Sequence, residues 1–287
     1  RVIMPLVINH WKKSTLIFGQ KTDPIIPYIM VTFDSSFADN YAVVKNLLQN
    51  GMNVARINCA HDDEATWSKM INHLKRATRH TNLNCKIYMD LAGPKIRTRI
   101  INKGKEKGKV QVKEGELIWL ADKAKGFKDD DIVISANEQG IIAMLKKGER
   151  VFIDDGIIKG IIETTKKDRT AMRIVRISAG KKQIKEGKGI NFPDSEIAIS
   201  PLTDFDKASL PFICEHADMV GYSFVRYPSD LATLQNTLAA ISTRQPIIII
   251  KIETPEAVKN LPGLLLQGML QEAFGVMIAR GDLAVEI

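Results

Sequence analysis

The chain has 287 residues, of which 45% are hydrophobic and 26% are charged, proportions that are ordinary for a globular protein and exclude a disordered one. The longest aliphatic run, around residues 247–250, is far too short to span a bilayer, so we expect no membrane partner. The formal net charge of +8 suits an anionic ligand, and because the lysine-rich stretches lack interleaved aromatic residues, we expect a small anionic substrate and no nucleic acid.

In chain order, residues 1–27 form an extension that matches no pattern. Beyond it, short apolar runs alternate with amphipathic stretches, which is typical of βα units. The runs predict six strands: Tyr28–Thr32, Asn53–Asn58, Lys86–Asp90, Met219–Phe224, Ile247–Ile252 and Val276–Ala279. The amphipathic stretches predict five helices: Asp39–Gln49, Glu64–Arg79, Asp204–His216, Asp230–Ser242 and Pro255–Leu266. We also expect a capping box of Thr203 with Asp206, and Ser229 as an N-cap.

The pattern changes between residues 98 and 192, where short alternating runs are separated by Gly- and Lys-rich turns. The runs predict strands at Lys109–Val112, Leu117–Leu120, Val151–Ile153 and Ala171–Ile177. We interpret 98–192 as a small β-rich domain inserted into an α/β domain, whose two parts would be 28–97 and 193–287.

The apolar strands indicate a parallel sheet that is covered on both faces. On pattern alone the α/β domain could be an open sheet or a parallel (β/α)₈ barrel, which would need two strands beyond the six. The chain begins with Arg1 and ends directly after an apolar run, so we expect it to be part of a longer protein.

Three of the strands end with polar residues two positions apart: Arg56 with Asn58, Lys251 with Glu253, and Arg280 with Asp282. Asp90 closes a fourth strand. A spacing of two places both side chains on one face of a strand, and parallel sheets collect active sites at the carboxyl ends of their strands. The alternative is that these residues form buried ion pairs that close the sheet.

The chemistry of these residues indicates a metal and a phosphate. The carboxylates of Glu253 and Asp282 suit a Mg²⁺ ion that keeps several waters. The cations of Lys251 and Arg56 suit phosphate oxygens and the charge that develops during transfer.

Other catalytic signatures are missing. The chain has neither a P-loop nor a glycine-rich dinucleotide fingerprint, and its five histidines lack metal spacing, although His61 follows a strand end and is a pocket candidate. Its three scattered cysteines favour a reduced, cytoplasmic setting.

Several of these segments resemble motifs of pyruvate kinases, in the order of that family. They are Asn53-Val-Ala-Arg-Ile-Asn-Cys-Ala-His61, Met89-Asp-Leu-Ala-Gly-Pro-Lys-Ile-Arg97, Ile153-Asp-Asp-Gly156, Gly187-Lys-Gly-Ile-Asn-Phe-Pro193, Leu202-Thr-Asp-Phe-Asp206, Ser223-Phe-Val-Arg226, Lys251-Ile-Glu253 and Ala279-Arg-Gly-Asp-Leu283. The resemblance covers about residues 29–287 and implies a (β/α)₈ barrel with an inserted lid domain, transferring phosphate from phosphoenolpyruvate to ADP to give pyruvate and ATP.

The resemblance also implies roles for single residues. Glu253 and Asp282 would hold the catalytic Mg²⁺ or Mn²⁺, and Lys251 would neutralise charge on the phosphoryl group and the enolate. The other expected roles are phosphate binding by Arg56, substrate binding by Arg280, Gly281 and Asp282, a monovalent-cation pocket at Asn58, Asp90, Leu91 and Lys95, and nucleotide binding by His61, Arg97 and Lys188.

The chain departs from the family at the monovalent-cation pocket. Many members have Ser where this chain has Ala60, and Thr where it has Leu91, so a hydroxyl ligand is lost. Lys95 stands where potassium-dependent members tend to have Glu. We hypothesise that the Lys95 ammonium supplies the charge of K⁺, which is then not required.

Two other readings stay open at this point. One is a related barrel that uses metal-enolate chemistry, such as an aldolase or lyase of 2-oxo acids, and the other is an inactive homologue. The family's proton-donating Thr would follow residue 287, so we expect the 287-residue chain by itself to be catalytically incomplete. The full-length protein is expected to be a homo-oligomer.

Overall fold

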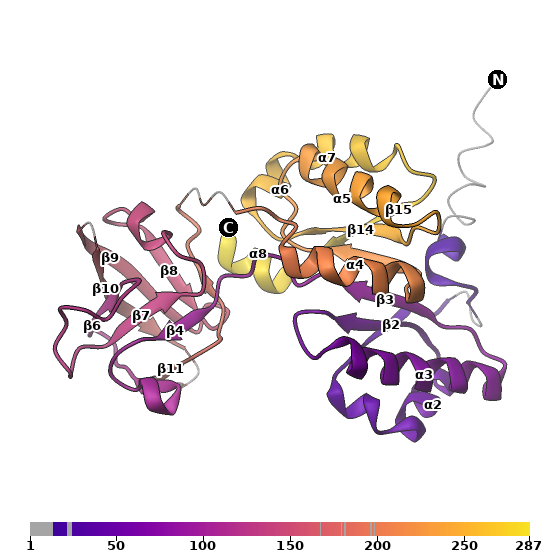
Figure 1. Cartoon of the computed structure of the whole chain (residues 1–287), viewed down its shortest axis with the longest axis horizontal. Helices are drawn as coiled ribbons and strands as arrows, with labels where there is room; N and C mark the ends of the chain where they lie inside the picture. Colours follow the sequence, from indigo (N-terminus) through magenta and orange to yellow (C-terminus); the bar gives the residue numbers. More distant parts are fainter. Residues whose placement is uncertain are drawn as a thin grey trace. The chain divides into compact units, whose positions relative to one another are not determined.

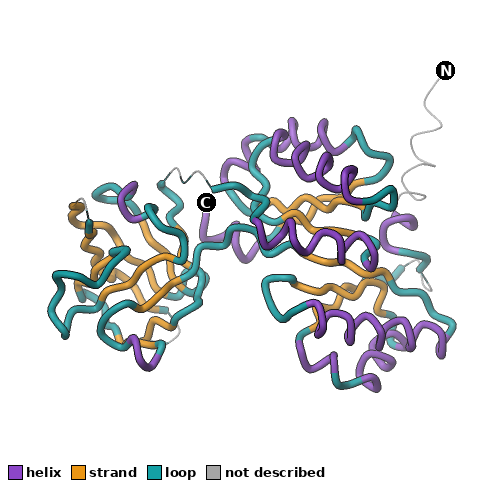
Figure 2. The backbone as a smooth tube through the Cα atoms, viewed as in Figure 1, coloured by secondary structure: helices purple, strands orange, loops and turns teal. Residues whose placement is uncertain are grey.

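The computed structural model of the chain describes residues 14–21, 25–166, 168–178, 180, 182–195, 197 and 199–287, so most of the unassigned extension 1–27 lies outside the described residues. The chain divides into two compact units, which are visible in Figures 1 and 2. The first contains residues up to Pro94 together with Ser200–Ile278. The second contains Lys95–Ile199 and also Ala279–Ile287, and the domain limits proposed from the sequence stay a prediction.

A six-stranded parallel sheet forms the centre of the first unit. Its order is β1 (Ile29–Phe33), β2 (Met52–Asn58), β3 (Lys86–Asp90), β13 (Met219–Tyr222), β14 (Ile247–Ile252) and β15 (Phe274–Ile278). The inner strands β2, β3, β13 and β14 are largely buried on both faces, as in β14, where five of the six residues are buried, whereas the edge strands β1 and β15 are mostly exposed or half-buried. The sequential order of parallel strands confirms the predicted parallel α/β barrel class with six strands.

Helices alternate with these strands and lie outside the sheet in Figure 1. They are α2 (Tyr41–Gln49), α3 (Glu64–Thr81), α4 (Asp204–His216), α5 (Pro228–Ile241), α6 (Pro255–Lys259) and α7 (Leu261–Gly268), with a 3₁₀-helix, η1 (Ser35–Ala38), before α2. The predicted capping box is confirmed: the Thr203 hydroxyl accepts from the Asp206 amide, and the Asp206 carboxylate accepts from the Thr203 amide.

Three helix predictions were wrong in detail. The helix predicted from Asp39 starts at Tyr41, because η1 occupies the preceding residues and Asn40 caps α2. The stretch 255–266 is two helices, since Pro262 cannot donate a helical hydrogen bond and instead lies in the first turn of α7. Ser229 is not an N-cap, because the helix begins two residues before the predicted Asp230, at Pro228, and the Asp230 carboxylate accepts from the amide of the capping residue Tyr227.

The second unit contains the predicted β-rich insert. Its seven-stranded mixed sheet nearly closes on itself in the order β12 (Ile190–Asn191), β8 (Arg150–Ile153), β9 (Ile158–Lys166), β10 (Arg169–Ile177), β6 (Leu117–Leu120), β7 (Val133–Ala136) and β4 (Thr98–Ile100). A second sheet pairs β5 (Lys109–Gln111) with β11 (Gln183–Lys185), and the short 3₁₀-helices are η2 (Lys105–Lys107) and η3 (Ile142–Met144). This unit has its own apolar core, which includes Ile118, Val151 and Ile174.

The segment after β15 was predicted incorrectly. The strand ends at Ile278 and the chain continues as a helix, α8 (Arg280–Glu286), which belongs to the second unit. Arg280 and Asp282 therefore lie in the first turn of a helix, where residues two apart do not share a face, and the strand-spacing argument does not apply to them.

No helix in the described part of the chain is both long and apolar enough to cross a membrane.

Candidate active site

The carboxyl ends of three strands of the first unit bring the predicted polar residues together. Asn58 at the end of β2 pairs in register with Asp90 at the end of β3, and Arg56 pairs with Tyr88. Gly221 of β13 lies beside Asp90. Lys251 is the penultimate residue of β14. The parallel register therefore places these residues at one edge of the sheet.

Asp90 is the hub of the cluster and is completely buried. Its Oδ2 atom accepts hydrogen bonds from Arg56 Nε, at 3.1 Å, and from Arg56 Nη2, and it lies 3.2 Å from Lys251 Nζ. Its other oxygen, Oδ1, accepts from the Tyr88 hydroxyl at 2.9 Å. One carboxylate thus holds both predicted phosphate-binding cations.

Lys251 has two further partners. Its ammonium donates to Ser223 Oγ at 2.9 Å and lies 2.8 Å from Glu253 Oε1. Ser223 Oγ in turn donates to the Leu91 carbonyl at 2.6 Å, which orients the hydroxyl so that it accepts from the lysine. A buried lysine is tolerated only when it is paired in this way.

Glu253 is completely buried just after β14. Its Oε2 atom accepts from the Phe224 amide at 2.6 Å. Phe224 has a φ of 56°, in the left-handed region that bulky residues rarely adopt. This turn after β13 aims the backbone amide at the carboxylate.

The charges of the cluster balance. Burial alone lowers the pKa of Lys251, but the carboxylates of Asp90 and Glu253 outweigh it, so the net pKa lies above the ordinary lysine value. The pKa of Arg56 is likewise raised, because the Asp90 carboxylate outweighs desolvation. Both side chains are therefore cations at neutral pH, and they face two carboxylates.

Other predicted site residues of the first unit have local roles. The Asn58 side chain accepts from the Ala60 amide at 3.1 Å and shapes the turn after β2. The Leu91 side chain is buried, and its backbone bonds to Gly221 and Ser223. His61 is exposed, and its carbonyl accepts from Trp67 Nε1 at 2.9 Å.

The remaining predicted residues lie in the second unit. Lys95 Nζ donates to Asp282 Oδ1 at 2.7 Å and lies 3.5 Å from Asp155 Oδ1. The lysine expected to replace a monovalent cation is thus engaged by two carboxylates. Arg280 and Gly281 are exposed at the start of α8.

The two predicted nucleotide-binding cations of this unit are also engaged. Arg97 Nη1 donates to the Gly187 carbonyl at 2.9 Å. Lys188 Nζ lies 3.0 Å from Asp154 Oδ1, at the turn that carries the Asp154-Asp155-Gly156 sequence. Nucleotide binding by Arg97 and Lys188 stays a prediction.

The predicted metal ligands suit a hard divalent ion in kind. Glu253 and Asp282 are carboxylates, and Mg²⁺ commonly takes only one or two of these together with water and substrate oxygens. Among the described residues no group of three or more His, Cys, Asp or Glu side chains is gathered as a metal site. The two carboxylates belong to different units, so their sharing of one ion stays a prediction.

The sequence did not single out Tyr88, Thr32 or the role of Ser223. Thr32 Oγ1 accepts from Arg56 Nη1 at 3.0 Å and completes the support of that guanidinium. Ser223 was visible only as part of the Ser223-Phe-Val-Arg226 motif, and Tyr88 only as an aromatic residue inside a buried strand. Neither pattern by itself shows a contact with Lys251 or Asp90.

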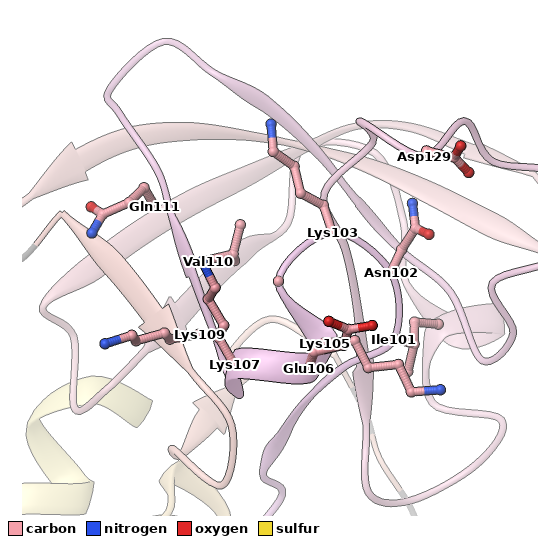
Figure 3. A pocket seen from close by; sticks show the side chains of 11 residues that line it. Ile101, Asn102, Lys103, Lys105, Glu106, Lys107, Lys109, Val110, Gln111 and Asp129 are labelled. Atoms are coloured by element: carbon pink, nitrogen blue, oxygen red, sulfur yellow. The ribbon is translucent and has the colours of Figure 1, made fainter.

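A cavity of about 730 Å³ lies elsewhere, in the second unit, and Figure 3 shows it lined by the lysine-rich segment 101–111 and Asp129. The amines of Lys103, Lys105 and Lys109 point in different directions in Figure 3, and all three side chains are exposed. This agrees with solvated lysines on a loop and a strand edge. The polar cluster at the strand ends is the stronger candidate, because its groups are buried and converge.

Comparisons with known proteins show the family to which the chain belongs. The family described as "Pyruvate kinase, barrel domain" matches residues 28–287. The chain is 32% identical over 243 residues to the pyruvate kinase of Geobacillus stearothermophilus, an alignment that covers 84% of this chain and 39% of that protein. It is 30% identical over 251 residues to the pyruvate kinase of Thermotoga maritima, covering 87% of this chain and 50% of the relative. Pyruvate kinase 2 of Synechocystis is 32% identical over 248 residues, an alignment that covers 85% of this chain and 40% of that protein.

The chain therefore spans half or less of the length of these relatives. Its parallel strands, its all-β insert and the charged residues at its strand ends all fall within the matched range. On this evidence the chain belongs to the pyruvate kinase barrel-domain family.

Proposed function

We propose that the protein containing this chain transfers the phosphoryl group of phosphoenolpyruvate to ADP, giving pyruvate and ATP. The observation that carries this proposal is the Lys251 ammonium, which is buried, paired with Asp90 and Glu253, and held at the strand ends beside Arg56. Such a fixed cation suits a reaction whose catalysis consists mainly of positioning and charge stabilisation.

The proposed chemistry assigns one task to each cation. As the bond between phosphorus and the enol oxygen breaks, a terminal oxygen of ADP bonds to phosphorus and negative charge passes to the enol oxygen. The enolate then takes up a proton at its terminal carbon, which gives pyruvate. Lys251 stabilises this charge on the transferred group and on the enolate, and Arg56 binds the phosphate. Because Asp90 and Glu253 hold the ammonium in place before substrate arrives, little reorganisation is needed.

Glu253 and Asp282 are the residues that would hold Mg²⁺ or Mn²⁺. When bound, the ion supplies positive charge to the phosphoryl oxygens. The first turn of α8 at Arg280, Gly281 and Asp282 supports the proposed seating of the substrate carboxylate, since the first amides of a helix lack helical partners. His61, Arg97 and Lys188 are proposed for the nucleotide, and we further propose a cytoplasmic homo-oligomer.

An activity assay of the full-length protein tests the proposal. With phosphoenolpyruvate, ADP and Mg²⁺, a lactate dehydrogenase-coupled assay should show steady formation of pyruvate that stops when Mg²⁺ is chelated. Metal-dependent binding of phosphoenolpyruvate without turnover would contradict the proposal and favour an inactive homologue. Cleavage or condensation of a 2-oxo acid in place of phosphoryl transfer would favour an aldolase or lyase.

A further inference from the structure

Tyr88 is a buried residue of β3 whose side chain makes one hydrogen bond among the described residues. Its side chain is 0% exposed, and its hydroxyl donates to Asp90 Oδ1 at 2.9 Å. The opposite carboxylate oxygen, Oδ2, holds Arg56 and Lys251. The tyrosine therefore satisfies the half of Asp90 that the two cations do not reach.

Gly221 on the neighbouring strand makes this contact possible. A Cβ atom at this position would lie 2.0 Å from the Tyr88 hydroxyl oxygen and 2.1 Å from Asp90 Oδ1. Separations this short cannot be accommodated without moving one of the two groups. The glycine thus provides the space in which the tyrosine meets the carboxylate.

The geometry has a consequence for Lys251 and Arg56. The side-chain torsion of an aspartate that turns its carboxylate has a broad energy profile, so the orientation of the group depends on its partners. A hydrogen bond on Oδ1 sets this orientation and directs Oδ2 at both cations. Because Asp90 and Tyr88 are both fully buried, water has no ready access to replace the hydroxyl.

We propose that Tyr88 is a positioning residue, which acts through Asp90 to hold Lys251 and Arg56 in place, and that Gly221 provides the room for its hydroxyl. The inference rests on the proposed phosphoryl transfer and extends it to residues that do not contact the substrate. A neutral donor performs this task without changing the charge balance of two cations against two carboxylates. A charged group at the same place would upset that balance.

The test compares two tyrosine variants of the full-length protein in the coupled phosphoenolpyruvate assay. Tyr88→Phe removes the hydroxyl and keeps the ring. Since a hydrogen bond to a charged group is at stake, kcat should fall by about 10- to 100-fold, while KM for ADP stays within about twofold. Tyr222→Phe is the matched control, because Tyr222 is equally buried in the same sheet and its hydroxyl has no hydrogen-bond partner among the described residues.

A second set of variants separates positioning from packing. Gly221→Ala should lower both the melting temperature and kcat, because the new methyl group displaces Tyr88 or Asp90. Adding Tyr88→Leu to Gly221→Ala removes the ring that the methyl group meets and leaves only its contact with Asp90 Oδ1, so the melting temperature should recover in part while kcat stays low. Recovery of kcat together with stability would show that Tyr88 only fills space, and would overturn the inference.

The outcomes also separate a failure of the proposed role of Tyr88 from a failure of the proposed phosphoryl transfer. Absence of turnover in the parent protein would overturn the proposed function, and the inference would fall with it. An active parent whose Tyr88→Phe variant has an unchanged kcat would overturn the inference alone. An active parent with a specific loss in Tyr88→Phe, and none in Tyr222→Phe, would support both.

Discussion

At the scale of single residues, the site is a compact ion cluster in which each cation has a buried acceptor. Buried charges of this kind contribute little net stability, because desolvation offsets their attraction. Their value lies in geometry: Lys251 is held by Asp90, Glu253 and Ser223 before any substrate binds. Such a group is expected to matter far more for activity than for folding.

Replacing Lys251 by Met keeps the length of the side chain and removes its charge. We expect kcat for phosphoryl transfer to fall by about 100- to 1,000-fold or more, as for the loss of a fixed donor at a developing anion. The coupled assay measures this. Lys259→Met is the control, since Lys259 is an exposed residue at the end of α6 and should leave the rate unchanged. Equal rates for the two variants would contradict the role of Lys251.

Lys251 also gives stability a pH dependence of known sign. Its pKa is raised in the folded protein, so its contribution is fully present below the unfolded value of about 10.4 and is lost as the pH rises through the folded value. We expect the free energy of unfolding to fall more steeply above about pH 10.4 in the parent than in Lys251→Met. Urea titrations from pH 8 upward measure this, and parallel curves would count against it.

The hypothesis that the Lys95 ammonium replaces K⁺ can be tested by comparing rates with and without K⁺. The ammonium is engaged by Asp282 and Asp155, and its role in place of K⁺ stays a prediction. We expect initial rates of the full-length protein to be nearly the same in KCl and in an equal concentration of tetramethylammonium chloride. A many-fold activation by KCl would show the hypothesis to be wrong.

At the scale of elements, α4 is anchored by its first turn. Besides its capping bonds with Thr203, Asp206 accepts from the Gly93 amide at 3.3 Å, so the cap also fixes the segment that follows β3 and Asp90.

Removing the cap hydroxyl should therefore be measurable. Thr203→Ala should lower the free energy of unfolding by about 1 kcal/mol in urea titrations. Thr203→Ser keeps the hydroxyl and serves as the control. A loss of the same size in Thr203→Ser would assign the effect to the lost methyl group.

The limits of helices and strands were predictable where residues close in the sequence determine them. The limits of β3, β14 and α4 agree with the prediction, because apolar runs and a capping box mark them. The break between α6 and α7 was missed although Pro262 marks it, since the apolar periodicity continues across the proline. Helix α8 was missed because Arg280 and Asp282, two residues apart after an apolar run, show the same sequence pattern as the ends of the other strands.

At the scale of the whole molecule, each unit has a separate apolar core. Leu234 is completely buried in the first, and Ile174 is completely buried in the second. We expect Leu234→Ala and Ile174→Ala each to cost about 2–5 kcal/mol, and each to lower the thermal transition of its own unit. Differential scanning calorimetry can resolve this, and one transition shifted equally by both variants would show that the units unfold together.

The sequence by itself determined the βα alternation, the inserted all-β segment, the family, and the charged residues Arg56, Asp90, Lys251 and Glu253 that meet at the strand ends. These follow from periodicities and motifs that are local in the chain. Only the tertiary structure decided that Asp90 divides its oxygens between Tyr88 and two cations, that Gly221 makes room for this, and that Asp282 lies on a helix beside Lys95. Such contacts depend on strand register and on packing between residues far apart in the chain, which local patterns do not encode.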